Sequence, residues 1–190
     1  RFDGFKFGSG AASKFIIIGD EFEELLDSRG QMTASLLSDY TADSTQLYEV
    51  LVQGTVFDVG GRANKTTEII ALDTSSSYIG LRPRFDGYID EGIAPSFDVV
   101  NVNRSGEATS FEGVQYSVQR IYYEYNWFYS DGWRWNRIRV DDETVAAGEV
   151  TSNNLVLDTP LSWGRHEIIL TNAEGFKTIH EFYVGWGSDA

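Results

Sequence analysis

Hydrophobic residues in this chain recur with a period of two, and turn-forming pairs interrupt them at short intervals. Such alternation places successive side chains on opposite faces of a strand, whereas a helix needs apolar residues three and four positions apart. From residue 78 onward we expect strands at residues 78–85, 96–103, 114–129, 133–140, 143–150, 155–157, 163–171 and 176–186. Pairs such as Asp86-Gly87 and Glu174-Gly175 separate them. This pattern predicts an antiparallel β-sandwich.

The first part of the chain contains fewer candidate strands. Residues 47–59 and 66–72 flank Gly60-Gly61, a pattern typical of a hairpin with a glycine turn. A shorter strand is expected at residues 33–37, and residues 21–26 suffice for only one turn of helix. We therefore expect an incomplete sandwich here, with sheet edges that need a covering partner.

The small polar residues 73–77 lie between these two regions and predict a linker. We therefore divide the chain into a partial β-module, residues 1–77, and a complete β-sandwich, residues 78–190. Because the sequence begins with Arg1 rather than Met, we expect it to be a piece of a longer protein, with the missing strands before Arg1.

Charge and composition exclude several classes of protein. The 190 residues include 15 Lys and Arg against 29 Asp and Glu, a formal net charge of -14, which argues against a nucleic-acid-binding surface. Hydrophobic residues make up 42% and charged residues 23%, so the chain can fold around a core. The absence of cysteine excludes disulfides, thiolate metal sites and cysteine nucleophiles. The longest apolar run, residues 15–18, is too short to cross a bilayer.

One expected strand carries aromatic side chains on both faces. Tyr123, Tyr125, Trp127 and Tyr129 alternate with Tyr122, Glu124, Asn126 and Phe128, and Trp133 and Trp135 follow a turn. One interpretation is a sugar-binding platform built from flat aromatic rings. The other, which we favour, is a long hairpin with one face in the sandwich core and the other against a neighbouring domain, because exposed aromatic patches commonly mark protein contacts.

No motif in the chain predicts catalysis or metal binding. The acidic groups at residues 23–24, 90–91 and 141–143 lack the ligand spacing of a calcium loop and are expected to be solvated turns. His166 is expected to point inward as a hydrogen-bonded core residue, and His180 is expected to point outward without a role. We therefore expect no catalytic residue, no cofactor-binding residue and no metal ligand.

A series of short motifs is nevertheless specific in its order and spacing. They are LRPRFDG at 81–87, EG at 91–92, FDVV at 97–100, YNWFY at 125–129, DGWRW at 131–135, VAAG at 145–148, PLSWGR at 160–165 and FYVGW at 182–186. Together they resemble a macroglobulin-type domain of the bacterial alpha-2-macroglobulin family. Residues 4–8, 27–30 and 60–62 are similar to the end of the preceding domain of that family. One departure is His166, where the family tends to have a tyrosine whose hydroxyl would fix a backbone turn.

The resemblance implies an all-β fold of two consecutive antiparallel sandwich modules, macroglobulin or fibronectin-III-like, of which the first is incomplete. It also implies a parent protein that inhibits proteases: a protease cuts a bait segment, the molecule rearranges, and an internal thioester between a cysteine and a glutamine can acylate the attacker. No stretch of this sequence matches the bait or the thioester motif, so no functional residue of the family carries over. The implied role of the chain is a non-catalytic scaffold.

The resemblance further implies which partners the scaffold meets and where. They are the neighbouring domains of the parent chain and, through the parent, its target proteases. The implied location is the periplasm, with the parent anchored to the inner membrane outside this sequence. Two alternatives remain open. A carbohydrate-binding module needs Trp127, Trp133 or Trp135 exposed in a planar row, and a surface adhesin needs many copies of this unit in its parent.

Overall fold

Every regular element of the protein is a β-strand in the computed structural model, which describes residues 2–10, 23–34, 43, 45–72, 74–129 and 131–186. The strands are β1 Lys6–Phe7, β2 Tyr48–Phe57, β3 Ala63–Leu72, β4 Ser77–Pro83, β5 Tyr88–Ile89, β6 Ser96–Asn103, β7 Gln115–Tyr129, β8 Trp133–Glu149, β9 Asn154–Val156, β10 Gly164–Thr171 and β11 Lys177–Val184. No helix among these residues has the length and apolar character needed to cross a membrane. The predicted all-β fold class is confirmed.

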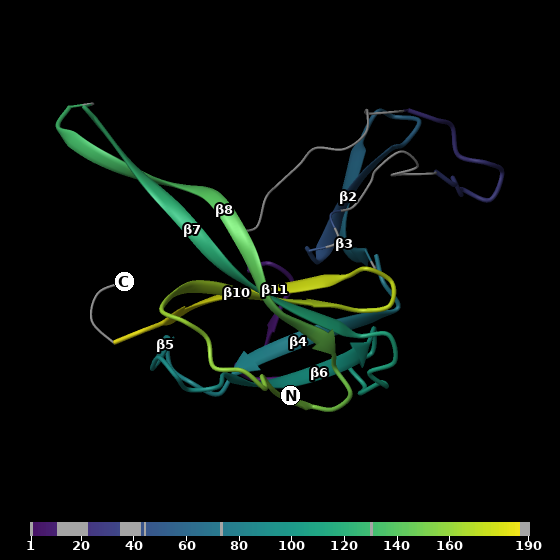
Figure 1. Ribbon diagram of the computed structural model, residues 1–190. Helices are drawn as coiled ribbons and strands as arrows, with labels where there is room; N and C mark the ends of the chain where they lie inside the picture. The colour runs from purple at the N-terminus through teal and green to yellow at the C-terminus, as the bar shows by residue number, and fades with distance from the viewer. Residues whose placement is uncertain are drawn as a thin grey trace.

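Two sheets face each other and form the sandwich (Figure 1). One has the strand order β1-β4-β6-β9, and the other has the order β5-β11-β10-β7-β8. All pairings are antiparallel except that of β5 with β11, which is parallel. β2 and β3 pair only with each other among the described strands, and they form a separate two-stranded ribbon.

The core lies between the inner faces of the two sheets. Its largest fully buried side chains include Phe97, Ile79 and Leu81 from the first sheet and Ile168 and Leu170 from the second. Further aromatic rings join them: Phe97 lies 5.4 Å from Phe85 and 5.7 Å from Phe182, centroid to centroid, in tilted edge-to-face geometry. Burial of these side chains provides the main driving force for folding of the sandwich.

Most of the strands agree with the sequence patterns. β6 has the predicted limits, and the hairpin of β2 and β3 turns at the predicted glycines. The two strands predicted at residues 133–140 and 143–150 are a single strand, β8, which continues through register shifts where its partner β7 passes from Val118 to Gln119 and from Tyr122 to Tyr123. A β-bulge bends a strand and interrupts the alternation of its side chains between the two faces, but the strand itself continues. The interrupted alternation therefore suggested two strands where there is one.

Other expectations in the first part differ or cannot be compared. Residues 33–34 are not in a strand, and residues 23–26 form no helical turn. The rest of those two predicted elements, and the apolar run at 15–18, lie outside the described residues. β1 and β5 were not predicted, because a two-residue strand is too short to show alternation.

The C-terminal residues of the predicted linker are hydrogen-bonded to the sandwich. Ser75 is buried, and its hydroxyl accepts a hydrogen bond of 3.1 Å from the side-chain amide of Asn172. The same amide donates to the carbonyl oxygen of Ser77 at 2.7 Å. The Glu174 carboxylate accepts hydrogen bonds from the backbone and the hydroxyl of Ser76, which lower the pKa of that carboxyl. Residues 75–77 are therefore not a free linker.

The first strand also belongs to the sandwich. Phe7 of β1 lies opposite Gly80 of β4, and Gly8 bonds to β11 in the other sheet by donating to the Thr178 hydroxyl and accepting from the Ile179 amide, both at 3.0 Å. A segment from the start of the chain thus connects the two sheets. Sequence pattern could not show this, because the partners lie more than 70 residues away.

Substitution of Gly80 tests how tightly β1 is packed. A methyl group at this position would lie 2.6 Å from the ring of Phe7 and 2.9 Å from a methyl of Val100. We expect Gly80→Ala to lower the free energy of unfolding by about 1–3 kcal/mol, measured by urea denaturation. The control is Gly54→Ala in β2, where the new methyl meets only Thr66 at 3.7 Å. Equal effects of the two substitutions would contradict close packing of β1 on β4.

Candidate interaction surface

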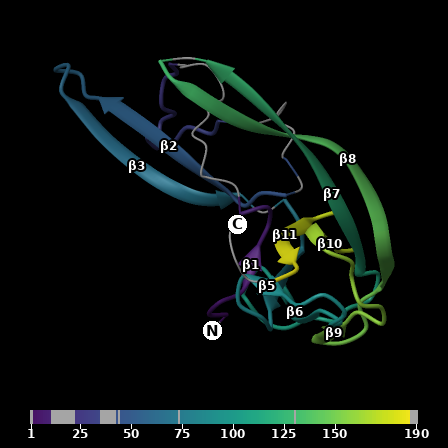
Figure 2. The ribbon, with the colours of Figure 1, turned by 60° about the vertical axis from the view of Figure 1, so that its left-hand side comes forward.

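The β7–β8 hairpin extends well beyond the sandwich to which it belongs. β7 pairs with β10 only from Gln115 to Ile121, whereas its pairing with β8 continues to Tyr129 opposite Trp133. The outer part is therefore a two-stranded ribbon, and Figures 1 and 2 both show it leaving the body of the protein on the same side as the β2–β3 ribbon. We call residues 122–141 the aromatic ribbon.

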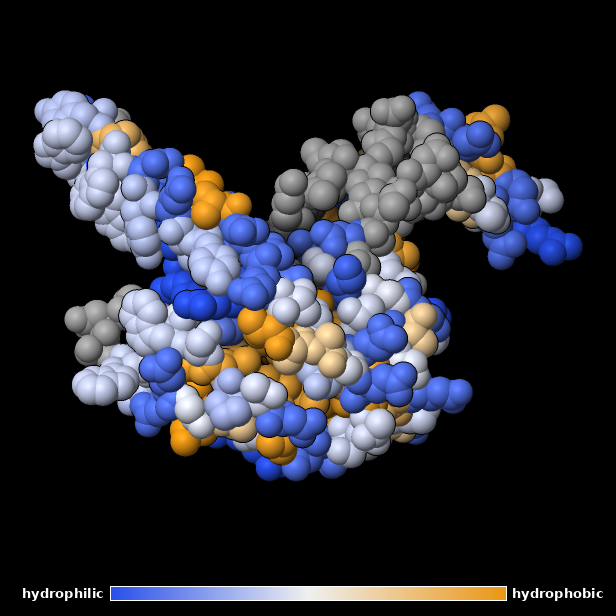
Figure 3. Space-filling model, viewed as in Figure 1, coloured by the Kyte–Doolittle hydropathy of each residue, from blue (hydrophilic) through white to orange (hydrophobic). Residues whose placement is uncertain are grey.

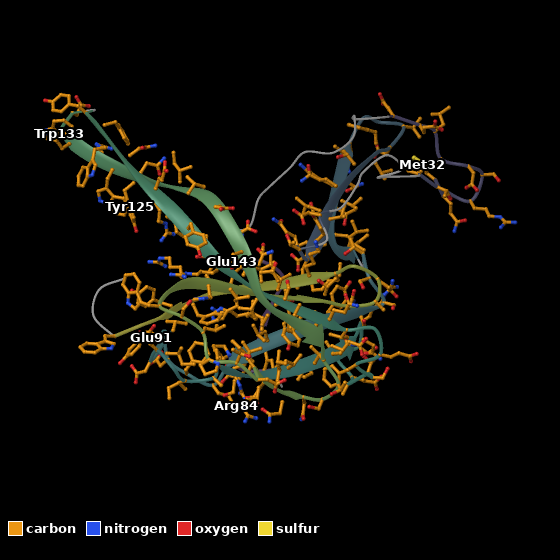
Figure 4. The ribbon with its side chains drawn as sticks, in the orientation of Figure 1. Met32, Arg84, Glu91, Tyr125, Trp133 and Glu143 are labelled. Atoms are coloured by element: carbon orange, nitrogen blue, oxygen red, sulfur yellow. The ribbon has the colours of Figure 1, made fainter. Side chains whose placement is uncertain are left out.

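One face of the aromatic ribbon is a continuous ladder of rings and guanidinium groups. Directly paired residues of an antiparallel hairpin share a face, which gives Tyr123, Tyr125, Trp127 and Tyr129 of β7 together with Trp133, Trp135, Arg137 and Arg139 of β8. We call these eight side chains the ladder face. Figure 4 shows Tyr125 partway along the ribbon and Trp133 near its tip.

The rings of the ladder face contact each other across the two strands. Tyr125 and Trp135 lie 5.6 Å apart with planes inclined by 54°, and Tyr129 and Trp133 lie 5.9 Å apart at 78°. The guanidinium carbon of Arg137 lies 4.2 Å above the ring centre of Tyr123. Such pairs stabilise the ribbon and hold the rings in fixed orientations.

These aromatic side chains are exposed. Trp127, Trp133 and Trp135 keep 65%, 74% and 57% of their surface accessible. The expectation that one face of the hairpin fills the sandwich core is therefore wrong for the outer part, because the ribbon projects past the end of β10, where no second sheet can cover it. An aromatic surface of this kind is typical of an interaction site.

The geometry of the rings bears on the sugar-binding interpretation. The exposure of the tryptophans agrees with it. The inclinations of 54° and 78° do not, because a flat sugar chain needs neighbouring rings that are close to coplanar. These two ring pairs therefore do not form a flat platform.

An ion-pair network fixes the base of the aromatic ribbon. Arg139 donates to the carboxylates of Glu167 at 2.8 Å and Asp142 at 2.9 Å, and to the side-chain carbonyl of Gln119 at 3.0 Å. The hydrogen bond to Glu167 is the main reason why the pKa of Arg139 is raised. Since Glu167 lies on β10 and is only 6% exposed, this network ties the ribbon to the sheet. No local sequence pattern indicated this network, because Arg139 and Glu167 are 28 positions apart.

The β2–β3 ribbon exposes a surface of different character. Its cross-strand pairs include Leu51 with Ile69 on one face and Val50 with Ile70 on the other. Leu51, Ile69 and Ile70 are all exposed. The ribbon diagrams show β2 and β3 extending away from the sandwich (Figures 1 and 2), and the space-filling view shows the same for the aromatic ribbon (Figure 3). The ribbon of β2 and β3 thus exposes aliphatic side chains on both of its faces.

His166 lies in the interior, and His180 is half-buried on the same face of β11 as Phe182. His166 is fully buried as expected, with Nδ1 3.1 Å from the carbonyl oxygen of Gly164, and burial lowers its pKa. His180 stacks on Phe182 at 6.5 Å with a 17° angle between the rings, so the expectation that it points outward is wrong. Residues two apart on a strand share a face, and Phe182 faces the core.

The acidic groups do not gather into a metal site. In the part of the chain that the structure describes, no cluster of three or more histidine, aspartate or glutamate side chains could hold a metal ion. Asp142 pairs with Arg139, and Glu143, labelled at the base of the ribbon in Figure 4, accepts a hydrogen bond of 3.0 Å from the Tyr122 hydroxyl. These two members of the 141–143 group are therefore structural partners rather than free residues of a solvated turn.

Removing Arg139 tests the network at the ribbon base. Arg139→Gln leaves the buried Glu167 carboxylate without its cation, so we expect the free energy of unfolding to fall by about 1–3 kcal/mol in urea denaturation. Arg134→Gln is the matched control on the same strand, because Arg134 is exposed and has no hydrogen bond or ion pair with any described residue. A change of about 0.5 kcal/mol or less is expected there. A loss as small for Arg139→Gln would show that the network adds no stability.

The two histidines make stability depend on pH. Burial and the neighbouring Lys6, whose ammonium lies 3.1 Å from Nδ1, lower the pKa of His180 from 6.5 to about 4. The unfolded chain therefore binds a proton that the folded chain does not, and stability is complete above pH 6.5 and is lost as the pH falls toward 4. We expect a loss of about 1–2 kcal/mol between pH 7 and pH 5, a range that lies above the titration of the ordinary carboxylates.

His180→Gln is the variant that identifies the group responsible. It should flatten most of this pH dependence in urea denaturation, leaving only the part due to His166. An unchanged slope in the variant would show that His180 does not cause it.

Comparison with known proteins agrees with this architecture. The family described as bacterial macroglobulin domain 6 matches residues 80–186. Alpha-2-macroglobulin of Xylella fastidiosa (strain 9a5c) is 27% identical over 169 residues, which cover 85% of this chain and 10% of that protein. Alpha-2-macroglobulin of Escherichia coli (strain K12) is 25% identical over 205 residues, which cover 96% and 12%. The chain thus spans about a tenth of the length of these curated relatives.

Solved structures show the same fold. Salmonella alpha-2-macroglobulin reacted with methylamine matches with a TM-score of 0.64 and 22% identity, over 98% of this chain and 13% of that one. The native conformation of E. coli alpha-2-macroglobulin matches with a TM-score of 0.56 and 21% identity, over 99% and 13%. The motif order between residues 81 and 186, the two-sheet sandwich and the family match over more than half of the sequence lead to one conclusion: the chain belongs to the bacterial macroglobulin family.

Proposed function

We propose that this chain is a non-catalytic scaffold within a bacterial alpha-2-macroglobulin-like protein that inhibits endopeptidases by bait and trap. In this proposal the second module comprises residues 78–190 together with β1 and residues 75–77, and the rest of residues 1–77 is the end of the preceding module. The modules space and orient the bait and thioester parts of the parent and transmit its rearrangement.

The main support for the proposal is that a sandwich of the macroglobulin family bears an aromatic ribbon that projects from it. A ribbon fixed to the sheet by Arg139 and Glu167 can pass force or orientation from one module to another. Its exposed Trp, Tyr and Arg side chains are the residue types that contribute most to protein–protein binding. Nothing in this arrangement requires chemistry at the ribbon itself.

The related proteins support the part that concerns proteases. Solved structures of E. coli alpha-2-macroglobulin include one activated by porcine elastase and one activated by trypsin. We extend this to the parent of the present chain: its partners are target proteases, its location is the periplasm, and its anchor to the inner membrane lies outside the sequence studied.

The direct test uses the intact parent protein and trypsin. After incubation, residual trypsin activity is measured on a small peptide and on a large protein substrate, a denaturing gel reports any covalent adduct, and free thiol is titrated before and after. We expect trypsin to keep its activity on the peptide and to lose about tenfold or more on the protein substrate. A covalent adduct together with released thiol would indicate that the parent contains a reactive thioester. Loss of activity on the protein substrate without thiol release would indicate that the parent encloses trypsin without a covalent bond.

The opposite result is equally clear. Trypsin that digests the parent and remains active on both substrates would overturn the inhibitor proposal. Heat-inactivated parent is the control for nonspecific competition by a digestible protein.

The exposure of Trp127, Trp133 and Trp135 keeps carbohydrate binding as a second candidate. It is tested by titrating the parent with soluble glucans while following tryptophan fluorescence. Saturable quenching that Trp133→Ala removes would favour it, and an unchanged spectrum would exclude the tested glycans.

A further inference from the structure

Arg137 is a half-buried cation without a counter-ion. Its guanidinium lies over the Tyr123 ring at 4.2 Å, and it makes no hydrogen bond or ion pair with any residue that the structure describes. Arg139, two residues further along β8, is paired with Glu167 and Asp142. Arg134 also has no such partner among the described residues, but it is exposed on the opposite face, whereas Arg137 is half-buried on the ladder face.

The stacked geometry suits recognition of a carboxylate. A guanidinium that rests on an aromatic ring keeps its N–H groups directed outward in the plane, where they can bind a carboxylate with two parallel hydrogen bonds. Trp127 and Trp135 pair with each other one step closer to the ribbon tip than Arg137, on the same face, and are exposed. A partner that covers these rings would exclude water from the Arg137–carboxylate pair and strengthen it.

The charge of the aromatic ribbon differs from that of the whole chain. Over residues 122–141 the three arginines balance three acidic residues, Glu124, Asp131 and Asp141, so the ribbon is neutral in a chain with a net charge of -14. Eight residues of strand span about 25 Å. This exceeds the screening length of about 8 Å at physiological salt, so the acidic body has little effect on what the outer ribbon meets.

We propose that the ladder face docks on another folded module of the same parent chain, and that Arg137 pairs there with an aspartate or glutamate. This inference rests on one part of the proposed function, namely that the chain is part of a larger protein with further modules. The relatives are about ten times longer, so most of the parent lies outside this sequence and is tethered to it. Tethering raises the effective concentration of such a partner to the millimolar range.

Other partners fit the surface less well. Asp131 lies in the turn at the ribbon tip, and its charge would oppose insertion into an anionic bilayer. The inclined rings do not form the flat surface that a glycan needs. A carboxylate-bearing protein surface is compatible with both the relief and the charge of the ladder face.

The experiment compares two charge reversals on one strand in the intact parent. Arg137→Glu changes the ladder face, and Arg134→Glu makes the same change of charge on the opposite face, opposite Phe128. Amide hydrogen exchange is followed in the peptides that cover residues 122–139. We expect Arg137→Glu to speed exchange about tenfold or more and Arg134→Glu to change it less than about twofold. Arg137→Gln, which removes the charge without reversing it, should have an intermediate effect.

Cross-linking identifies the partner. Replacement of Tyr125 by a photoreactive phenylalanine derivative should give a cross-link to a peptide of another module that contains an acidic residue. Reversing that acidic residue to arginine in the Arg137→Glu background should restore slow exchange. These readouts need no protease, so a parent that fails to inhibit trypsin can still show the docking, and an inhibitory parent can still lack it.

Three results would overturn the inference. They are equal effects of Arg137→Glu and Arg134→Glu on exchange, a cross-link that forms with lipid or glycan instead of protein, and cross-linked peptides without any acidic residue. Normal exchange in β10 and β11 shows that the sandwich of each variant is folded, so that none of these results can be attributed to unfolding.

Discussion

A single strand, β7, belongs both to the sandwich and to the aromatic ribbon, and the rest of the structure depends on this shared hydrogen-bonded ladder. Up to Ile121 its backbone is paired on both sides, by β8 and by β10, and beyond that point only β8 remains. The inner half is therefore held by the core, and the outer half takes its direction from the inner half. A ribbon built in this way keeps a defined orientation without a core of its own.

The ion-pair network at the base completes this arrangement. Bulges near Val118 and Tyr122 bend the hairpin as it leaves the sheet. Arg139 then binds Glu167 on the neighbouring strand, so the bend is fixed by side chains as well as by the backbone. The result is a rigid aromatic arm, in contrast to the β2–β3 ribbon, whose exposed surface is aliphatic and whose two strands pair only with each other among the described residues.

The two sheets of the sandwich are connected by chain segments distant in sequence. Gly8 bonds to β11, Phe7 packs against Gly80, and Asn172 fixes the chain where it enters β4. These contacts place the start of the chain within the sandwich, so residues assigned by sequence to the first module contribute to the stability of the second. These contacts include hydrogen bonds as well as apolar packing of Phe7, whereas the core itself comes mainly from the longer alternating strands.

The sequence by itself determined the all-β class and the approximate limits of most strands, though not the continuity of β8, because alternation and glycine turns act through neighbouring residues. β6 and the β2–β3 hairpin are examples, and the inward orientation of His166 followed from the same alternation. The sequence also contained the motifs that identify the family. The prediction for His180 was wrong, because His180 was assigned to the face opposite Phe182 although residues two apart on a strand share a face.

Only the tertiary structure decided where the aromatic strand lies relative to the core. β7 has a single aromatic residue before Ile121 and six after it, but a change in composition does not show that the pairing with β10 stops at Ile121. The pairing of Arg139 with Glu167, and of Lys6 with His180, joins residues 28 and 174 positions apart. Contacts of this kind depend on how whole sheets pack, and local patterns carry no information about them.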